Sequence, residues 1–127
     1  MGSAIARCLL AATVIAAVIM GPAADAGVTT RVRVTDYRFR PTPVTIDRGT
    51  SVRWRNVTQA NDHTVTAYSD DWSKDATIGP GETTGFRFDR RGTFRYYCSL
   101  HAHITNDGRC VANPGISTRM CGSVVVV

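Results

Sequence analysis

Short runs in which apolar and polar residues alternate follow one another along most of the chain. Val32 and Val34 alternate with arginines, and the same period of two recurs in residues 52–55 and 86–88. This alternation is typical of strands that bury one face and expose the other to water. Turn residues separate the runs, for example at Asp47–Gly49. No stretch after residue 26 has the period of an amphipathic helix, so the pattern predicts an all-β sandwich.

The first 26 residues have a different pattern, which is typical of a secretory signal. Arg7 precedes an apolar run from Cys8 to Met20, and Ala24-Asp25-Ala26 fits the small-x-small rule for cleavage after Ala26. The apolar run is short for a membrane span, which makes a retained anchor the weaker alternative. We therefore expect a signal peptide over residues 1–26, one domain over residues 27–127, and an exported protein that is periplasmic or secreted.

The amino-acid composition excludes several classes of protein. The chain of 127 residues is 43% hydrophobic and 20% charged, which leaves no case for a disordered or fibrous protein. Its three histidines are too few to ligate several metal ions, so multi-site redox enzymes are excluded. The formal net charge is +5. Candidates for a patch that attracts acidic partners are Arg87, Arg90, Arg91 and Arg95.

The cysteine count is unusual for an exported domain. Beyond residue 26 the chain contains Cys98, Cys110 and Cys121, which is an odd number. In an oxidising compartment two cysteines are expected to pair. The third cysteine then needs another role.

Cys98 ends one of the alternating runs and is followed closely by a histidine. The period of two places Phe94, Tyr96 and Cys98 on one face, and the aromatic neighbours make it the core side. His101 comes three residues later, a spacing that lets the loop fold its imidazole back toward the thiolate. Together they would form half of a metal site. A buried free thiol beside a surface histidine is the alternative for an isolated Cys-x-x-His.

His63 and Met120 complete a recognisable set of ligand types. His63 stands at the start of a predicted strand, and Met120 is the one methionine beyond residue 26. Two histidines, one cysteine and one methionine are the ligands of a blue copper centre, with the thioether as a weak axial ligand. Zinc would favour more thiolates or a carboxylate. The residue types therefore favour copper.

Six segments of the chain follow one another in a fixed order. They are Phe39–Pro41 before Val44–Ile46, Gly49–Asn56, His63–Ala67, Ile78–Gly81, Gly92–His101 and Met120–Val126. Together they resemble the cupredoxins, the small type 1 blue copper proteins, and particularly their plastocyanin- and amicyanin-like branch. The resemblance runs through nearly all of residues 27–127. It implies a Greek-key β-sandwich with one copper ion at one end, bound by His63, Cys98 and His101 with Met120 axial.

One departure from the family is an insertion between the last two expected ligands. The family methionine usually follows the second histidine within a few residues, whereas here Ala102–Arg119 separates His101 from Met120. Met120 keeps the family's Met-x-Gly frame, so we expect an enlarged ligand loop. A disulfide between Cys110 and Cys121 would restrain this loop and resolve the odd cysteine count. Closing such a loop stabilises the fold by about 3 kcal/mol in the chain-entropy model.

Several other positions carry expectations of their own. Thr64 stands where many relatives have an asparagine that helps hold the cysteine sulfur, which affects the redox tuning. His103 is an alternative ligand, although its place in the inserted loop favours an exposed or partner-facing histidine. We expect Trp54 in the core and Trp72 as a packing residue at the rim. Asn56-Val57-Thr58 matches a glycosylation acceptor.

The expected function is one-electron transfer. The resemblance implies an exported, monomeric carrier that cycles one copper ion between Cu(II) and Cu(I) and docks transiently to redox partners near His101. The positive charge favours acidic partners. The alternative is a copper storage or delivery module, but such sites are commonly exposed and rich in methionine or histidine. We expect no enzymatic activity, no nucleic-acid partner and no stable membrane insertion.

Overall fold

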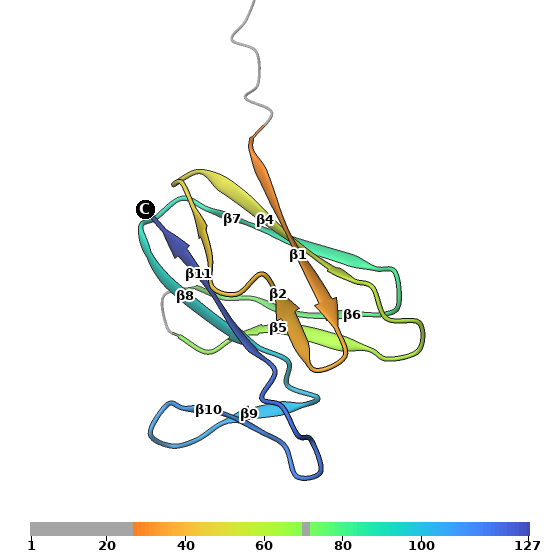
Figure 1. Ribbon diagram of the computed structural model, residues 1–127. Coiled ribbons are helices and arrows are strands. Elements are labelled where there is room, and N and C mark those ends of the chain that lie inside the picture. Colours follow the sequence, from red (N-terminus) through yellow and green to blue (C-terminus); the bar gives the residue numbers. More distant parts are fainter. Residues whose placement is uncertain (1–26, 70–71) are drawn as a thin grey trace, which may run out of the picture.

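The computed structural model describes residues 27–69 and 72–127 (Figure 1). This part of the chain forms strands, turns and loops, which confirms the all-β class, and it contains no helix that could cross a membrane. The expected signal peptide lies outside the described residues. The strands are β1 (Thr29–Thr35), β2 (Arg38–Arg40), β3 (Val44–Ile46), β4 (Thr50–Asn56), β5 (His63–Ala67), β6 (Asp75–Ile78), β7 (Thr83–Phe88), β8 (Gly92–Tyr97), β9 (Ala102–Ile104), β10 (Cys110–Ala112) and β11 (Cys121–Val126).

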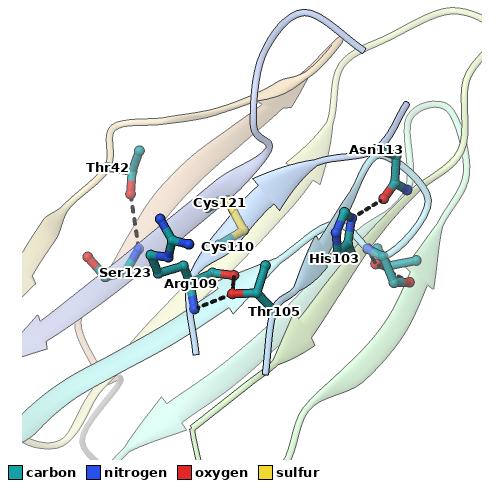
Figure 2. The surroundings of a disulfide bond; sticks show 10 residues. Thr42, His103, Thr105, Arg109, Cys110, Asn113, Cys121 and Ser123 are labelled. Atoms are coloured by element: carbon teal, nitrogen blue, oxygen red, sulfur yellow. Dashed lines mark hydrogen bonds between the residues drawn. A yellow bond between two sulfur atoms is a disulfide. The ribbon is translucent and has the colours of Figure 1, made fainter. Parts of the chain in front are cut away.

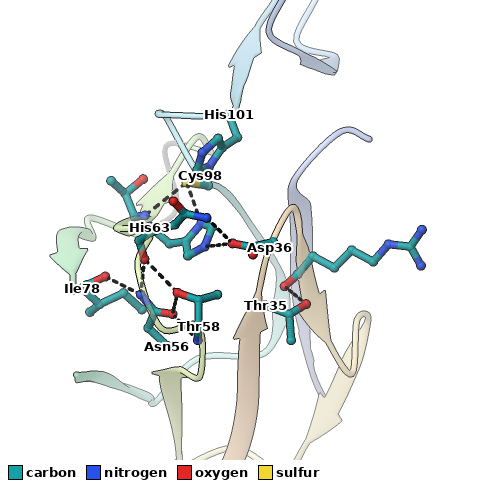
Figure 3. A network of polar contacts seen from close by, with 11 residues as sticks. Thr35, Asp36, Asn56, Thr58, His63, Ile78, Cys98 and His101 are labelled. Carbon is teal, nitrogen blue, oxygen red and sulfur yellow. Dashed lines mark hydrogen bonds and ion pairs between the residues drawn. The ribbon is translucent and has the colours of Figure 1, made fainter. Parts of the chain in front are cut away.

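Two sheets pack against each other as a β-sandwich. One sheet has the strand order β2-β1-β4-β7 and the other β3-β11-β8-β5-β6. Most neighbours are antiparallel, but β1 runs parallel to β4, and β3 runs parallel to β11. β9 and β10 pair with each other and extend beyond one end of the sandwich (Figure 1). The β1–β2 turn, the start of β5 and the end of β8 meet at this same end (Figures 1 and 3).

Aromatic side chains fill the space between the sheets. Trp54 and Tyr96, one from each sheet, are fully buried with ring centroids 5.3 Å apart, which confirms Trp54 as a core residue. Trp72 is only 9% exposed and stacks 6.4 Å from Trp54, so it belongs to the core and not to the rim. Its indole N–H donates to the carbonyl of Arg95 at 3.2 Å, which satisfies the polar end of this buried ring.

Gly122 is required by the close approach of β11 to the core. In the strand register Gly122 lies opposite Tyr96 on β8. A Cβ atom at this position would lie 2.5 Å from the Tyr96 ring, closer than real contacts allow. The glycine in the Met-x-Gly frame therefore has a packing role, because it lets β11 lie over the Tyr96 ring beside Met120.

Candidate metal centre

Three expected ligands meet at the end of the sandwich where β9 and β10 project. His63 is the first residue of β5, Cys98 directly follows β8, and His101 lies in the turn before β9. Alternation along β5 and β8 turns His63 and Cys98 toward the core, as it does Val65 and Tyr96. The sequence analysis named these three residues, and the structure brings them together.

The turn after β8 folds His101 back toward the sulfur. The amides of His101 and Ala102 both donate to the carbonyl of Cys98, at 3.1 and 2.9 Å. Cys98 Sγ consequently lies 3.3 Å from Nδ1 of His101 and 3.8 Å from Nδ1 of His63. All three donor atoms lie within 4.8 Å of one another. One sulfur and two imidazole nitrogens therefore point at a common position.

Burial favours the neutral form of both imidazoles. His63 and Cys98 are fully buried, whereas His101 is half-buried. Desolvation lowers the pKa of His63, and the proximity of His101 lowers it further. Desolvation also lowers the pKa of His101. Because a neutral imidazole is the metal-binding form, the fold holds both histidines in the state that a metal ion needs.

Thr64 holds the Cys98 sulfur in place. Its backbone N–H donates to Cys98 Sγ at 3.2 Å, and its hydroxyl oxygen accepts the amide hydrogen of Ser99 at 2.8 Å. The two hydroxyls of Thr64 and Ser99 also lie 3.1 Å apart. The threonine thus ties the start of β5 to the residue after Cys98, so the position that departs from the family pattern still supports the sulfur.

Met120 returns to the centre despite the long insertion. Its carbonyl accepts the amide hydrogen of Cys98 at 3.0 Å, and its side chain is fully buried in the core cluster that includes Cys98. The pairing of β11 with β8 continues directly from this contact. The structure therefore places Met120 beside the donor cluster.

The enlarged loop contains the β9–β10 hairpin, and a disulfide ties the start of β10 to the start of β11. Cys110 and Cys121 are bonded, as expected, with their Cα atoms 6.3 Å apart (Figure 2). Cys110 begins β10 and Cys121 begins β11, directly after Met120. The bond therefore fixes the loop at the point where the chain returns to the centre. Cys98 is the one free cysteine of the described residues.

His103 lies outside the donor cluster. It is exposed on β9, and its Nδ1 lies 2.9 Å from the side-chain oxygen of Asn113 (Figure 2). The amide group of Asn113 in turn donates to the carbonyl of Leu100 at 3.2 Å. These contacts join the two sides of the loop, so this histidine has a structural partner and is not placed as an alternative ligand.

An acidic residue at the centre was missed by the sequence analysis. Asp36, in the turn between β1 and β2, lies 3.4 Å from His63 Nε2, within ion-pair distance but without the alignment of a hydrogen bond (Figure 3). Asn61 donates its amide hydrogen to the same carboxylate oxygen at 2.8 Å. Asp36 therefore faces the nitrogen of His63 that points away from the sulfur.

The neighbouring Tyr37 touches the other histidine. Its ring packs edge-on to His101 with centroids 5.0 Å apart. Its φ of 64° is the only positive value among the described non-glycine residues, a conformation that is rare for a bulky side chain. The two-residue turn thus contacts both imidazoles. The sequence analysis did not single out this turn, and nothing in the local sequence indicated where it would dock.

Asn56 is a structural residue and does not fit a glycosylation acceptor. Its side chain is fully buried and donates to the carbonyls of Asn61 and Ile78 at 2.8 and 2.9 Å. Its side-chain oxygen accepts from the amide and hydroxyl of Thr58 (Figure 3). Attaching a sugar would break this set of bonds. Asn56 instead anchors the loop that carries Asn61 toward Asp36.

The donor set fits a copper ion. A thiol and two imidazoles, two of the three side chains fully buried, converge within 4.8 Å, and a thioether residue lies beside them. Soft sulfur donors combined with imidazole suit copper, and a trigonal His2Cys set with a weak axial thioether is its blue form. The residues that would hold such an ion are His63, Cys98 and His101, and Met120 lies next to them.

Comparisons with known proteins place the chain by family and by fold. A family model described as a cupredoxin-like domain matches residues 8–111. Comparison with curated protein sequences gives no match. The family match therefore covers most of the chain, including the donor residues at positions 63, 98 and 101.

Solved structures agree with this result at the level of the fold. A purple cupredoxin from Nitrosopumilus maritimus has 19% identity and a TM-score of 0.57, covering 76% of this chain and 98% of its own. An amicyanin from Paracoccus versutus has 21% identity and a TM-score of 0.56, covering 84% and 86%. A copper-containing nitrite reductase from Thermus scotoductus has 20% identity and a TM-score of 0.58. Its alignment covers 91% of this chain and 25% of the enzyme.

Proposed function

Because the chain belongs to the cupredoxin-like family, we propose that it is an exported blue copper protein that carries single electrons between redox partners. His63, Cys98 and His101 hold one copper ion in this proposal, and Met120 is the axial ligand. The convergence of the three donor atoms within 4.8 Å carries the proposal. The neighbouring structures support the fold, and the chain's own residues supply the donor set.

The surroundings of the donors favour rapid electron exchange. When bound, copper supplies a one-electron couple between Cu(II) and Cu(I). The hydrogen bonds of Cys98 with Thr64 and Met120 keep the sulfur and the backbone around it in one arrangement. Burial of His63 excludes water from that side of the site. A fixed, dry donor set changes little between the two oxidation states, which keeps the reorganisation small.

His101 is the proposed exit for the electron. It is half-buried, and the adjacent Leu100 is an exposed apolar residue with 51% of its surface accessible. A small apolar surface around a redox centre suits a transient complex. The formal charge of +5 favours an acidic partner, and this attraction is screened over about 8 Å at physiological ionic strength. Association should therefore slow as salt rises, while exchange with a neutral small oxidant should not.

Storage or delivery of copper is the second candidate function. A site that releases its metal is expected to expose its donors, whereas His63, Cys98 and Met120 are fully buried. The burial favours electron transfer. The likeness to nitrite reductase covers only a quarter of that enzyme, so we propose a carrier and no enzymatic activity.

The test is copper reconstitution of the purified protein, followed by visible spectroscopy and voltammetry. We expect an intense thiolate-to-Cu(II) band that ascorbate bleaches and an oxidant restores, together with one reversible one-electron wave. A storage protein would instead lose copper to a chelator on each reduction. Absence of the visible band, or loss of copper within one redox cycle, contradicts the proposal.

A further inference from the structure

Seven arginines lie on the outer face of the four-stranded sheet. The inward positions of this sheet carry core residues such as Val32, Phe39 and Trp54. Along each strand, the residues that alternate with these core residues point outward, and most of them are exposed. We call this surface the arginine face; it consists of Arg31 and Arg33 on β1, Arg38 and Arg40 on β2, Arg53 and Arg55 on β4, and Arg87 on β7.

The strand register places these like charges directly beside one another. Arg31 is opposite Arg53 and Arg33 is opposite Arg55 in the β1–β4 pair, and Arg33 is also opposite Arg40 of β2. Cross-strand pairs of like charge oppose folding. The strands of this sheet have no acidic residue, and the one ion pair of the face among residues 27–69 and 72–127 joins Arg87 to Asp89 just beyond β7. Within this part of the chain the like-charge pairs therefore lower stability, and no other ion pair of the face compensates for them.

The other sheet shows that this charge is not a general property of the surface. Its five strands carry one arginine, Arg95, and one acidic residue, Asp75. Most of its remaining outward positions are threonine, serine or valine. Two sheets of the same domain thus differ by six arginines. A clustered, uncompensated charge on one face indicates selection for a binding partner outside the fold.

A glycine leaves space within the arginine face. Gly85 lies inside β7, opposite Arg53, and is exposed. A Cβ atom there would meet only the carbonyl oxygen of Val52, at the ordinary contact distance of 3.5 Å, so the fold itself does not require glycine. Glycine within a strand weakens the strand and often marks the close approach of a ligand or another surface.

We propose that the arginine face binds the phosphate groups of an anionic phospholipid membrane. A guanidinium group presents a planar fork that suits phosphate oxygens, and arginine binds them more specifically than lysine does. The outer side of a four-stranded sheet offers these forks as a broad array. The interaction is peripheral and electrostatic, and it is compatible with a chain that does not insert into the membrane.

The absence of an apolar anchor favours a membrane over an acidic protein. Protein interfaces usually have a buried centre with aromatic or other large side chains, surrounded by polar groups. The large apolar residues that the described structure exposes are Val28, Val57, Leu100 and Val127, and none lies within β1, β2, β4 or β7. A charged lipid surface needs no such centre. The proposal also leaves Leu100 and His101 free, because they lie in the turn between β8 and β9.

Vesicle binding without added copper tests this proposal separately from the redox function. All eleven strands lie within residues 27–127, so this part is used, without the apolar stretch Cys8–Met20 that would itself bind lipid. Co-sedimentation is measured with vesicles of phosphatidylcholine alone and with vesicles containing equal phosphatidylglycerol. We expect binding to the anionic vesicles only, weakening as salt rises from 0.05 M to about 0.5 M.

A matched pair of variants locates the surface. R31Q/R53Q removes two charges from the arginine face, and R95Q/R109Q removes two charges from exposed positions elsewhere. The face variant should lose roughly tenfold in vesicle affinity, whereas the control should lose less than about threefold. Removing a like-charge pair should also leave the thermal stability of the face variant unchanged or raised.

Three results would overturn the proposal. The first is no binding to phosphatidylglycerol vesicles at low salt. The second is an equal loss in both variants, which would show that net charge alone acts. The third is binding of polyglutamate that is sensitive to R31Q/R53Q without any vesicle binding, which would assign the face to an acidic protein.

Discussion

The two sheets of the sandwich contribute unequally to the metal centre. Strands β5 and β8 of the five-stranded sheet position His63 and Cys98, and Met120 lies directly before β11 of the same sheet. The four-stranded sheet supplies no donor and reaches the centre only through Asp36 and Tyr37 in its first turn. Its outer face carries the arginines instead. The residues of the metal centre and the clustered arginines therefore belong to different sheets. Substitutions can change the one group without changing the other.

The largest expected effect is the loss of the metal centre when the sulfur of Cys98, which directly follows β8 of the five-stranded sheet, is replaced. Cys98→Ser replaces the sulfur on which both imidazoles converge, so the visible thiolate-to-Cu(II) band should disappear completely. His103→Ala is the control, because His103 is exposed and hydrogen-bonded to Asn113. Absorption spectra after copper addition compare the two variants. A blue Cys98→Ser protein would show that the sulfur is not a ligand.

The second-largest effect is a loss of folding stability, and it is expected to differ between two glycines, one from each sheet. Gly122→Ala in β11 places a methyl group 2.5 Å from the Tyr96 ring and should lower the free energy of unfolding by roughly 1–3 kcal/mol. Gly85→Ala in β7 meets only a backbone oxygen at 3.5 Å and should change it by less than about 1 kcal/mol. Denaturant unfolding of the metal-free proteins measures both. Equal losses would mean that β11 is not closely packed on the core.

A smaller effect is expected at the axial position. Met120→Leu keeps an apolar side chain of similar volume but removes the thioether, so the protein should remain blue. The reduction potential should rise, because a weak donor to Cu(II) is lost. Voltammetry of the wild type and this variant gives the shift. If Met120→Leu changed neither the potential nor the spectrum while His103→Ala changed the spectrum strongly, a different ligand set would be required.

The smallest effect concerns the contribution of the four-stranded sheet. Asp36→Asn removes a negative charge 3.4 Å from His63 while keeping a side chain of the same shape. A nearby anion stabilises Cu(II) more than Cu(I), so the reduction potential should rise. Because Asp36 is about half exposed, its side chain having 49% of its surface accessible, the expected shift is at most about 40 mV.

Asp89→Asn is the matched control for this charge change. Asp89 pairs with Arg87 at 2.8 Å and has no contact with the donor residues. Its variant should leave the potential unchanged while altering the net charge by the same amount. Equal shifts in the two variants would mean that Asp36 acts only through the overall charge of the protein.

The sequence predicted the fold and the donor set because both depend on local patterns. Alternation in β8 indicated that Cys98 points inward, and the spacing to His101 allowed a turn back to the sulfur. The family frame around Met120 indicated where the chain returns. The odd cysteine count, with Cys98 assigned to the metal by the family resemblance, left Cys110 and Cys121 as the expected pair across the insertion, and the structure confirms this bond.

The residues that the sequence did not reveal depend on tertiary contacts. Asp36 and Tyr37 lie 27 and 26 positions before the first donor, His63, and only the docking of the β1–β2 turn brings them to the histidines. The glycosylation motif at Asn56 was not taken as a prediction, and the burial of the Asn56 side chain, which a sequence match does not report, now gives the physical reason. Similarly, the local sequence of Trp72 did not show that its ring turns into the core.

The expected arginine patch also required the strand order. Arg87 and Arg95 are close in sequence but belong to β7 and β8, which lie in different sheets. Most arginines of the arginine face come instead from β1, β2 and β4. The alternating pattern identified β1 and β4 individually but did not place them side by side. Cross-strand register cannot be read from one strand at a time, so the clustering of charge became visible only in the structure.

The two fastenings of the enlarged loop have an evolutionary consequence. The hydrogen bond from Cys98 to Met120 holds the returning chain beside the donors, and the Cys110–Cys121 bond fixes the start of β10 just inside the tip of the β9–β10 hairpin. Mutations at its exposed tip, around Asn106–Gly108, are therefore buffered from the donor geometry. This tip can therefore change and acquire new recognition partners while the donor cluster keeps its arrangement, which makes the hairpin a replaceable module beside a constant metal centre.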